Sequence, residues 1–480
     1  MKARIITLIL VSLSIVSCSL NQEPATSWTD STYYKSEGQI KALVAGGYTR
    51  LQAALGTGFM LFGDVRSDLY MLNNQNATEI RDMLNNNITA YNKYSNWNSF
   101  FYAIQQANLV IKHAPEMLDG KIISNDVFAS VMGQSYAIRA FSYFWIVRIW
   151  GDAPILTTPS VSDSYHAEEV RKPAEDVFTL ILDDLKAARE YLSDNGDRTH
   201  FTKSAAWALE AQVLAWKKDW DGVLKACANV NASIYKLANL YSPDHSPSDP
   251  DFLNYIAGSG YANIFNVGEQ PESIFELSYS IDDSSESKNL YKLVANSESL
   301  HPSIACLDEY KANRMKDWRY FVNFYDNKKI TKYFINFGSA AAETRNVILL
   351  RYGEIVLLQA EAYAEKAAIL GAEGGAAMLK NSVVALNDIR NRAGGPAYTL
   401  DPAAFTLDDI DELRNYIAEE RKIELYGEGY RYFDLIRTGK VLERMEPING
   451  QNDMRSVVWP IYYTEILYSN GKLVQNEYYR

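Results

Sequence analysis

The sequence contains few of the residues on which catalysis and metal binding usually depend. It has 5 histidines and 3 cysteines among 480 residues, and the histidines are scattered without an H-E-x-x-H motif. The G-x-S-x-G, Walker A, G-x-G-x-x-G and EF-hand patterns are also absent. These absences exclude the enzyme classes that such motifs mark. Acidic residues are plentiful, however, and their spacing alone does not exclude a glycosidase-type carboxylate pair.

Basic residues are in the minority. The chain has 47 Lys and Arg against 59 Asp and Glu, a net charge of −12, and no block of positive charge. Such a chain is a poor candidate for nucleic-acid binding. Beyond the N-terminus no run approaches the ~18 apolar residues of a membrane-spanning helix. Tyrosine and tryptophan are abundant, at 33 and 9 residues, and favour a surface that stacks and donates hydrogen bonds.

The first twenty residues, MKARIITLILVSLSIVSCSL, have the layout of an export signal. Lys2 and Arg4 precede an apolar stretch at 5–16, which is too short to span a membrane and typical of a signal peptide. The stretch runs into I-V-S-C, which resembles a bacterial lipobox ending at Cys18. We therefore expect a signal peptide at 1–17 and a lipid anchor on Cys18. An incidental cysteine beside an ordinary cleavage site is the alternative.

A polar tether follows Cys18 and completes an anchor segment at 18–32. After this segment, helical patterns dominate the mature chain. Apolar residues recur at helical spacing, and small residues alternate with large ones in neighbouring segments. This alternation resembles tetratricopeptide-type packing and predicts about four helix pairs in a mostly α fold with long irregular loops and a few short strands. The segments with this pattern are 134–150, 174–192, 204–230 (two helices with a tight turn), 350–370 and 376–393.

The chain divides by composition into an N-terminal helical region at 33–240, a loop-rich connection at 241–303 and a C-terminal region at 304–480. The connection holds several prolines and glycines and the run IDDSSESKN, with a β-type stretch at Ser273–Ser280. Whether Cys227 and Cys306 form a disulfide remains open. Export permits a disulfide between them, but two buried free thiols fit the sequence equally well.

The densest group of charges is EERKIELYGEGYRYFDLIRTGK, which begins at Glu419. Helical spacing brings Arg421 near Glu424 or Glu428, and a pair between Arg431 and Asp434 would span a single turn. We expect an ion-pair network at a helix corner here, and not a catalytic site.

Eight blocks follow one another in a recognisable order. They are TDSTYYKSEGQIKALVAGGYTRL, WNSFFYAIQQANLVI, GQSYAIRAFSYFWIVRIWGDAPIL, RKPAEDVFTLILDDLKAA, LLRYGEIVLLQAEAYAE, LNDIRNRAGG, IAEERKIELYGEGYRYFDLIRTG and WPIYYTEILYSNGKLVQNEYY. In this order they resemble the SusD/RagB family of outer-membrane nutrient-binding lipoproteins over essentially the whole mature chain. Two details depart from the family: SLNQE after Cys18 lacks an acidic stretch, and Asn476-Glu477-Tyr478 replaces the usual Asn-Pro before Gly-Tyr.

The resemblance implies a SusD-like helical fold, a place on the outer membrane facing the exterior, and no enzymatic activity. It also implies a partner, a SusC-like TonB-dependent β-barrel transporter, which the protein covers as a hinged lid and to which it passes a bound oligosaccharide. Some members resemble peptide binders instead. A surface glycoside hydrolase is the alternative from another class. No cofactor is predicted, since no loop has the ligand spacing of a Ca²⁺ site.

A sugar ring has an apolar C–H face and a fringe of hydroxyls, which aromatic rings and amide or charged side chains match. The Asn-rich segment 64–98 combines these types and also holds Tyr91. Further aromatic residues lie in 313–321 and 255–266 and at Tyr291, where the resemblance places ligand-binding loops only approximately. For each aromatic residue, packing in the core is the alternative. The predicted ligand-binding residues are Asp68, Arg81, Tyr94, Trp97, Asn98, Tyr261, Tyr291, Trp318 and Tyr320.

Overall fold

The computed structural model describes residues 34–73, 77–160, 170–279, 290, 293, 300–325, 329–334 and 345–480. The predicted signal peptide at 1–17, the predicted lipidation site Cys18, the whole anchor segment at 18–32 and Tyr291 lie outside these ranges. Within them, no helix has the length and apolar character that crossing a membrane requires.

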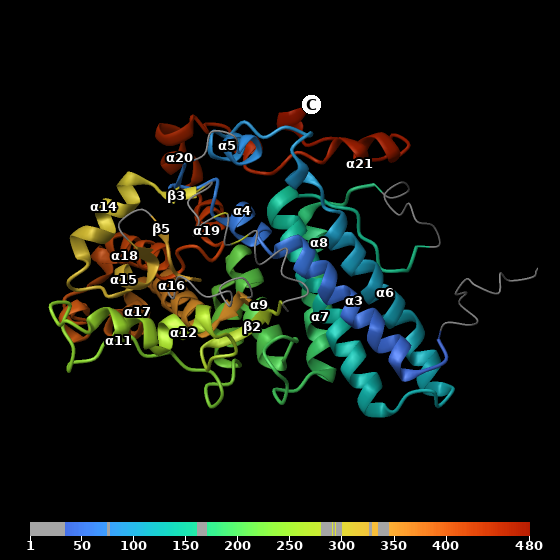
Figure 1. Cartoon of the computed structure of the whole chain (residues 1–480), viewed down its shortest axis with the longest axis horizontal. Helices are drawn as coiled ribbons and strands as arrows, with labels where there is room; N and C mark the ends of the chain where they lie inside the picture. The colour runs from blue at the N-terminus through green and yellow to red at the C-terminus, as the bar shows by residue number, and fades with distance from the viewer. Residues whose placement is uncertain are drawn as a thin grey trace, which may run out of the picture.

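A row of paired helices forms the framework of the molecule (Figure 1). Each helix in the row packs on the next, so the four pairs build one continuous array. This arrangement confirms the predicted mostly helical fold. The helices of the array are α3 (Glu37–Leu55), α6 (Asn98–Asp119), α7 (Asn125–Trp150), α8 (Ala174–Tyr191), α9 (Lys203–Trp216), α10 (Trp220–Ala228), α16 (Tyr352–Leu370) and α17 (Gly375–Gly394).

Local sequence explains where these helices begin and end. Helix α7 is buried over most of its C-terminal half because other elements cover several of its sides, and it stops at Gly151, which has φ +75°. The predicted turn between α9 and α10 is present. Asp219 accepts a hydrogen bond from Gly222 N at 3.0 Å and so begins α10, while Lys218 adopts φ +60°.

Shorter helices surround the array, and irregular segments connect them. They are α4 (Gly58–Gly63), α5 (Thr78–Leu84), α11 (Phe252–Gly258), α12 (Gly260–Asn266), α14 (Ile304–Asn313), α15 (Arg319–Asn323), α18 (Ile410–Glu424), α19 (Arg431–Arg437), α20 (Val441–Asn449) and α21 (Tyr463–Tyr468). The segment 255–266 was expected to be a loop and is helical instead. Ser259 caps α12 through Ala262 N, and the apolar residues of α12 face the core.

The described strands form three antiparallel two-stranded sheets. β1 (Tyr70–Leu72) pairs with β3 (Leu300–Pro302), β2 (Ser273–Leu277) with β6 (Val347–Arg351), and β4 (Phe324–Tyr325) with β5 (Lys329–Ile330). β2 lies within the stretch predicted to be β-type. In its pairing with β6, Ser273 stands opposite Arg351 and Leu277 opposite Val347. This ladder therefore joins the connection region to the start of α16.

The N-terminal and C-terminal regions meet closely at α4. A Cβ placed on Gly63 would lie 1.8 Å from the Gly429 carbonyl oxygen, so only glycine permits this contact. The neighbouring Asp64 is fully buried and accepts hydrogen bonds from Gly429 N at 2.8 Å and Arg431 N at 3.0 Å. Cys227 and Cys306 are both buried and free, which settles the open question about a disulfide.

Candidate functional site

The aromatic residues predicted to stack on a ligand lie mostly in the interior. Trp97 is 1% exposed and packs edge-on against Phe101 and Trp150, with ring centroids 5.2 and 5.8 Å away. Trp318 is 3% exposed and meets Phe252 edge-on at 5.0 Å. Because stacking requires an open ring face, neither indole offers a sugar a surface in this structure. Both indoles are part of the hydrophobic core.

Tyr261 and Tyr320 are buried as well. The Tyr261 hydroxyl donates to the Glu424 carbonyl oxygen at 3.2 Å, and the Arg392 guanidinium lies 4.4 Å from the ring centroid. Tyr320 packs against Phe324, with ring centroids 5.8 Å apart. Both rings belong to the large hydrophobic core cluster that also contains Trp97 and Trp318, so the predicted aromatic residues do not converge on one surface.

The polar members of the predicted set divide into two groups. Asp68 is buried and accepts from Arg431 Nε and Nη2 and from Arg444 Nε. Burial opposes ionisation, but the hydrogen bonds and charge of Arg431 hold the pKa of Asp68 well below its usual range. Asp68 is thus fixed in an ion pair. Arg81, Tyr94 and Asn98 are half-buried and stay near the surface.

Two exposed tyrosines form a pair, one of which, Tyr91, lies close to these residues in the chain. Tyr91 is 74% exposed and Tyr463 is 40% exposed, and their ring centroids lie 4.9 Å apart at 34°. The pair is held together by a hydrogen bond from Tyr463 N to the Ala90 carbonyl oxygen at 3.0 Å. Tyr462 packs against Tyr463 at 4.9 Å. We call Tyr91 and Tyr463 the tyrosine pair.

The Asn-rich segment pointed to one half of this pair. Tyr91 belongs to the segment 64–98, whose irregular part surrounds it, although α5 and β1 make that segment more regular than predicted. Tyr463 comes from α21, far away in the sequence, and no local pattern marked it. Only the folded chain brings these two exposed rings together.

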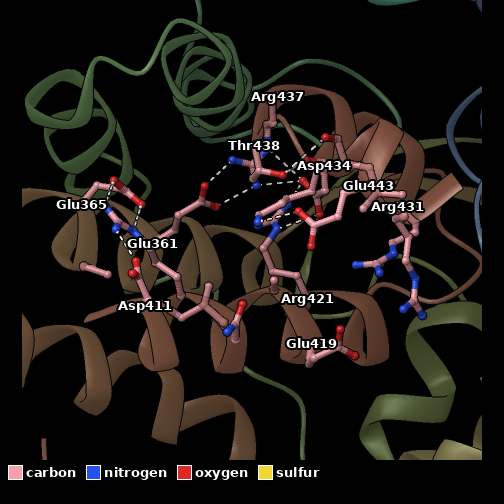
Figure 2. A pocket seen from close by; sticks show the side chains of 18 of the residues that line it. Glu361, Glu365, Asp411, Glu419, Arg421, Arg431, Asp434, Arg437, Thr438 and Glu443 are labelled. Carbon is pink, nitrogen blue, oxygen red and sulfur yellow. Dashed lines mark hydrogen bonds and ion pairs between the residues drawn. The ribbon is translucent and has the colours of Figure 1, made fainter. Parts of the chain in front are cut away.

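A cleft of about 590 Å³ lies between α16, α18, α19 and α20, and we call it the charged cleft. Charged side chains dominate its lining, with Trp220 of α10 at one wall. In Figure 2, Arg437, Asp434 and Arg421 converge near its centre, while Glu365 and Asp411 form a separate group at the left. The lining residues with charged side chains are Lys218, Glu361, Glu365, Asp411, Arg414, Glu419, Arg421, Arg431, Asp434, Arg437, Lys440, Glu443 and Arg444.

Two ion-pair systems lie in the charged cleft. One joins Arg414 to Glu365 and Asp411, and the other surrounds Asp434. Arg437 Nη2 bonds to Glu361 at 2.7 Å and Arg437 Nε bonds to Asp434 at 2.9 Å, while Arg421 Nε reaches the same Asp434 at 2.9 Å. Burial raises the pKa of Asp434, but the charges and hydrogen bonds of Arg421 and Arg437 lower it by more. The pKa therefore lies below its usual value, and the carboxyl group stays ionised. Asp434 therefore acts as a fixed acceptor and not as a proton donor.

The predicted ion-pair network in this region is confirmed, but two of its partners were misassigned. Arg431 was expected to pair with Asp434 across one turn and instead pairs with Asp68. Arg421 was expected near Glu424 or Glu428 and instead pairs with Asp434 and Glu354. Partners from other elements replaced the expected neighbours, because Asp68 lies against Arg431 of α19 and Asp434 of α19 lies against Arg421 of α18.

One surface group in the described ranges could hold a metal ion. The ligand atoms of His245, Asp249 and Asp251 all lie within 4.8 Å of one another. One imidazole and two carboxylates suit a divalent cation in principle. The His245 ring also stacks on Tyr255, with centroids 4.0 Å apart.

Comparisons with known proteins agree with this architecture. A model of the SusD family matches residues 306–479, and a model described as starch-binding associating with outer membrane matches 20–214. Two SusD-like proteins of Formosa agariphila are 29% and 27% identical to the chain. The alignments cover 98% and 91% of this chain and 97% and 91% of those proteins.

Solved structures show the same fold. A SusD superfamily protein from Bacteroides vulgatus has a TM-score of 0.74 at 20% identity, over 93% of this chain and 100% of its own. Surface glycan-binding protein A from Bacteroides thetaiotaomicron, solved in complex with laminarihexaose, has a TM-score of 0.69 at 20% identity, over 92% of this chain and 99% of its own. At these identities the likeness concerns the fold.

Proposed function

Because the chain belongs to the SusD/RagB family, we propose that it is a glycan-binding lipoprotein of the outer membrane. It captures an oligosaccharide outside the cell and delivers it to a SusC-like TonB-dependent transporter. The description of the matching N-terminal family supports starch binding and an outer-membrane location. The complex of a structural neighbour with laminarihexaose supports an oligosaccharide ligand. The lipid on Cys18 completes this proposal, and labelling with radioactive palmitate tests it in the wild type against Cys18→Ala.

The tyrosine pair is the observation that carries the proposed binding site. Two exposed rings, Tyr91 at 74% and Tyr463 at 40%, offer apolar faces, and each ring carries a hydroxyl group. Such rings match the C–H face and the hydroxyl fringe of a sugar. Arg81, Tyr94 and Asn98 lie in the same surface segment and supply further polar contacts in this proposal.

The proposed role is capture without chemistry. A retaining or inverting glycosidase needs one carboxyl group that stays protonated beside the scissile bond. In the charged cleft, Asp434 is held ionised by Arg421 and Arg437, and Glu361 is paired with Arg437. Overnight incubation of the pure protein with oligosaccharides tests this point. Unchanged oligosaccharide is expected, and shortened products would contradict it.

Isothermal titration with neutral hexasaccharides tests the binding site. Tyr91→Ala and Tyr463→Ala should each weaken binding at least ~10-fold, about 1.4 kcal/mol, because each removes a ring face, and neither should lower the melting temperature. Tyr478→Ala is the matched control, since Tyr478 is similarly exposed at 42% and lies outside the pair.

Wild-type affinity in both variants would remove the site. Binding of peptides in place of glycans would support the peptide-binding alternative, in which main-chain hydrogen bonds replace stacking on rings.

A further inference from the structure

We propose that the charged cleft is a second carbohydrate-binding site, separate from the tyrosine pair, that takes a short neutral oligosaccharide. The choice of a sugar as ligand rests on the proposed function, whereas the location rests on the cleft itself. Its volume of about 590 Å³ falls within the ~300–1,000 Å³ of small-molecule sites. The argument for a neutral, hydroxyl-rich ligand comes from the charges that line the cleft.

Every acidic side chain in the lining already has a cationic partner. Glu361 pairs with Arg437, Glu365 and Asp411 with Arg414, Glu419 with Lys422, Asp434 with Arg421 and Arg437, and Glu443 with Lys440. A cationic ligand would have to displace one of these partners and leave a charge unpaired, which is costly in a partly buried site. Most of the lining cations that an anionic ligand could approach, all except Lys218, are likewise held in ion pairs. The lining therefore favours a ligand without net charge.

Paired charges still have hydrogen-bonding capacity to offer. Arg414 Nε and Nη2 each reach Glu365 at 2.7 Å, a two-point contact that fixes both groups. A carboxylate has about four acceptor positions, so such a pair uses only half of them. A hydroxyl both donates and accepts, and can bond to a carboxylate and a neighbouring guanidinium without breaking the pair. Sugars carry many such hydroxyls.

The cleft also has an aromatic wall. Trp220, the first residue of α10, lines it and is half-buried. The turn before it fixes the backbone that carries the indole, because Lys218 adopts φ +60° and Asp219 caps α10 through Gly222 N. An indole beside fixed polar groups matches the two faces of a pyranose ring. An extended peptide has fewer hydroxyls to satisfy these groups.

Isothermal titration of the full mature chain with a panel of neutral hexasaccharides of glucose, xylose and mannose tests the proposal. The wild type should bind its ligand at two sites. Trp220→Ala should remove one site or weaken it at least ~10-fold, and Trp220→Phe, which keeps a ring, should retain it. The double variant Tyr91→Ala/Tyr463→Ala should abolish binding at the tyrosine pair and leave binding at the charged cleft unchanged.

The variants separate this proposal from the proposed function. Wild-type stoichiometry and affinity in a folded Trp220→Ala protein would overturn the second site while the tyrosine pair stands. Loss of all binding in the Tyr91→Ala/Tyr463→Ala variant would overturn it too. Tighter binding of hexagalacturonate or of an acidic peptide to the cleft than of any neutral hexasaccharide would show that the ligand class is wrong. Thermal melts establish that each variant is folded.

Discussion

The two halves of the molecule are held together by different forces. In the N-terminal half, aromatic and aliphatic side chains pack between helices, as where Phe62 meets Trp150 edge-on at 5.8 Å and Phe141 meets Phe201 edge-on at 5.5 Å. In the C-terminal half, charged side chains occupy the interior. The buried ionic cluster consists of Arg319, Lys332, Arg351 and Arg392 with Glu272, Asp317, Glu420, Glu424 and Glu428.

The two halves therefore fix their geometry in different ways. Apolar packing has little direction, so related side chains can replace one another with small losses. The ionic cluster depends on particular atoms: Glu424 accepts from Arg319 Nη1 at 2.8 Å, Arg351 Nη1 at 2.6 Å and Arg392 Nη2 at 2.5 Å. Because these arginines come from separate elements, the cluster joins β6, α15, α17 and α18 at one point. The cluster and the charged cleft share helix α18, which supplies Glu420 and Glu424 to the cluster and other residues to the lining of the cleft.

The largest expected effect comes from removing the central charge of the cluster. Glu424→Gln keeps the shape of the side chain but leaves three buried guanidinium groups with one carboxylate fewer. We expect a loss of about 3–5 kcal/mol in the free energy of unfolding, measured by urea denaturation. The control is Glu443→Gln, which breaks an exposed pair with Lys440 and should cost less than ~0.5 kcal/mol. Equal losses in the two variants would contradict the contrast between cluster and surface.

A second effect depends on pH at the junction of the two halves. Burial raises the pKa of Asp64 from 3.8 to about 7, and the hydrogen bonds that it accepts from two backbone N–H groups offset this rise only in part. A carboxyl whose pKa is higher in the folded protein binds protons more tightly there, so its stabilising contribution is complete below pH ~4 and is lost as the pH rises to ~7.

Thermal and urea unfolding at pH 5 and pH 8 measure this contribution. Asp64→Asn cannot titrate, so the wild type should lose roughly 2 kcal/mol more than the variant between these two pH values. Parallel losses in both proteins would show that Asp64 does not titrate in this range.

The smallest expected effect lies in the apolar half. Ile181 of α8 is fully buried between neighbouring helices, and Ile181→Val removes a single methyl group. We expect a loss of about 0.5–1.5 kcal/mol in urea denaturation, with no change in glycan affinity. A loss as large as that of Glu424→Gln would mean that the helical array is as sensitive to single atoms as the ionic cluster.

Local sequence predicted the helices of the array well and the site only in part. Periodicity located α8 and α16 and the turn between α9 and α10, because these features depend on neighbours in the chain. Trp97 and Trp318 stand in polar, irregular segments, yet both fold inward, since partners such as Trp150 and Phe252 come from other elements. Composition around a ring therefore does not predict its exposure.

The amino-acid sequence by itself determined the helical framework, the export signal pattern at the N-terminus and the family, because all three are written in short-range spacing and in the order of local blocks. The tertiary structure alone decided which rings face solvent and which charges pair. Tyr91 finds Tyr463 and Arg431 finds Asp68 across long stretches of chain. Such contacts depend on how distant elements pack, and no local pattern encodes that packing.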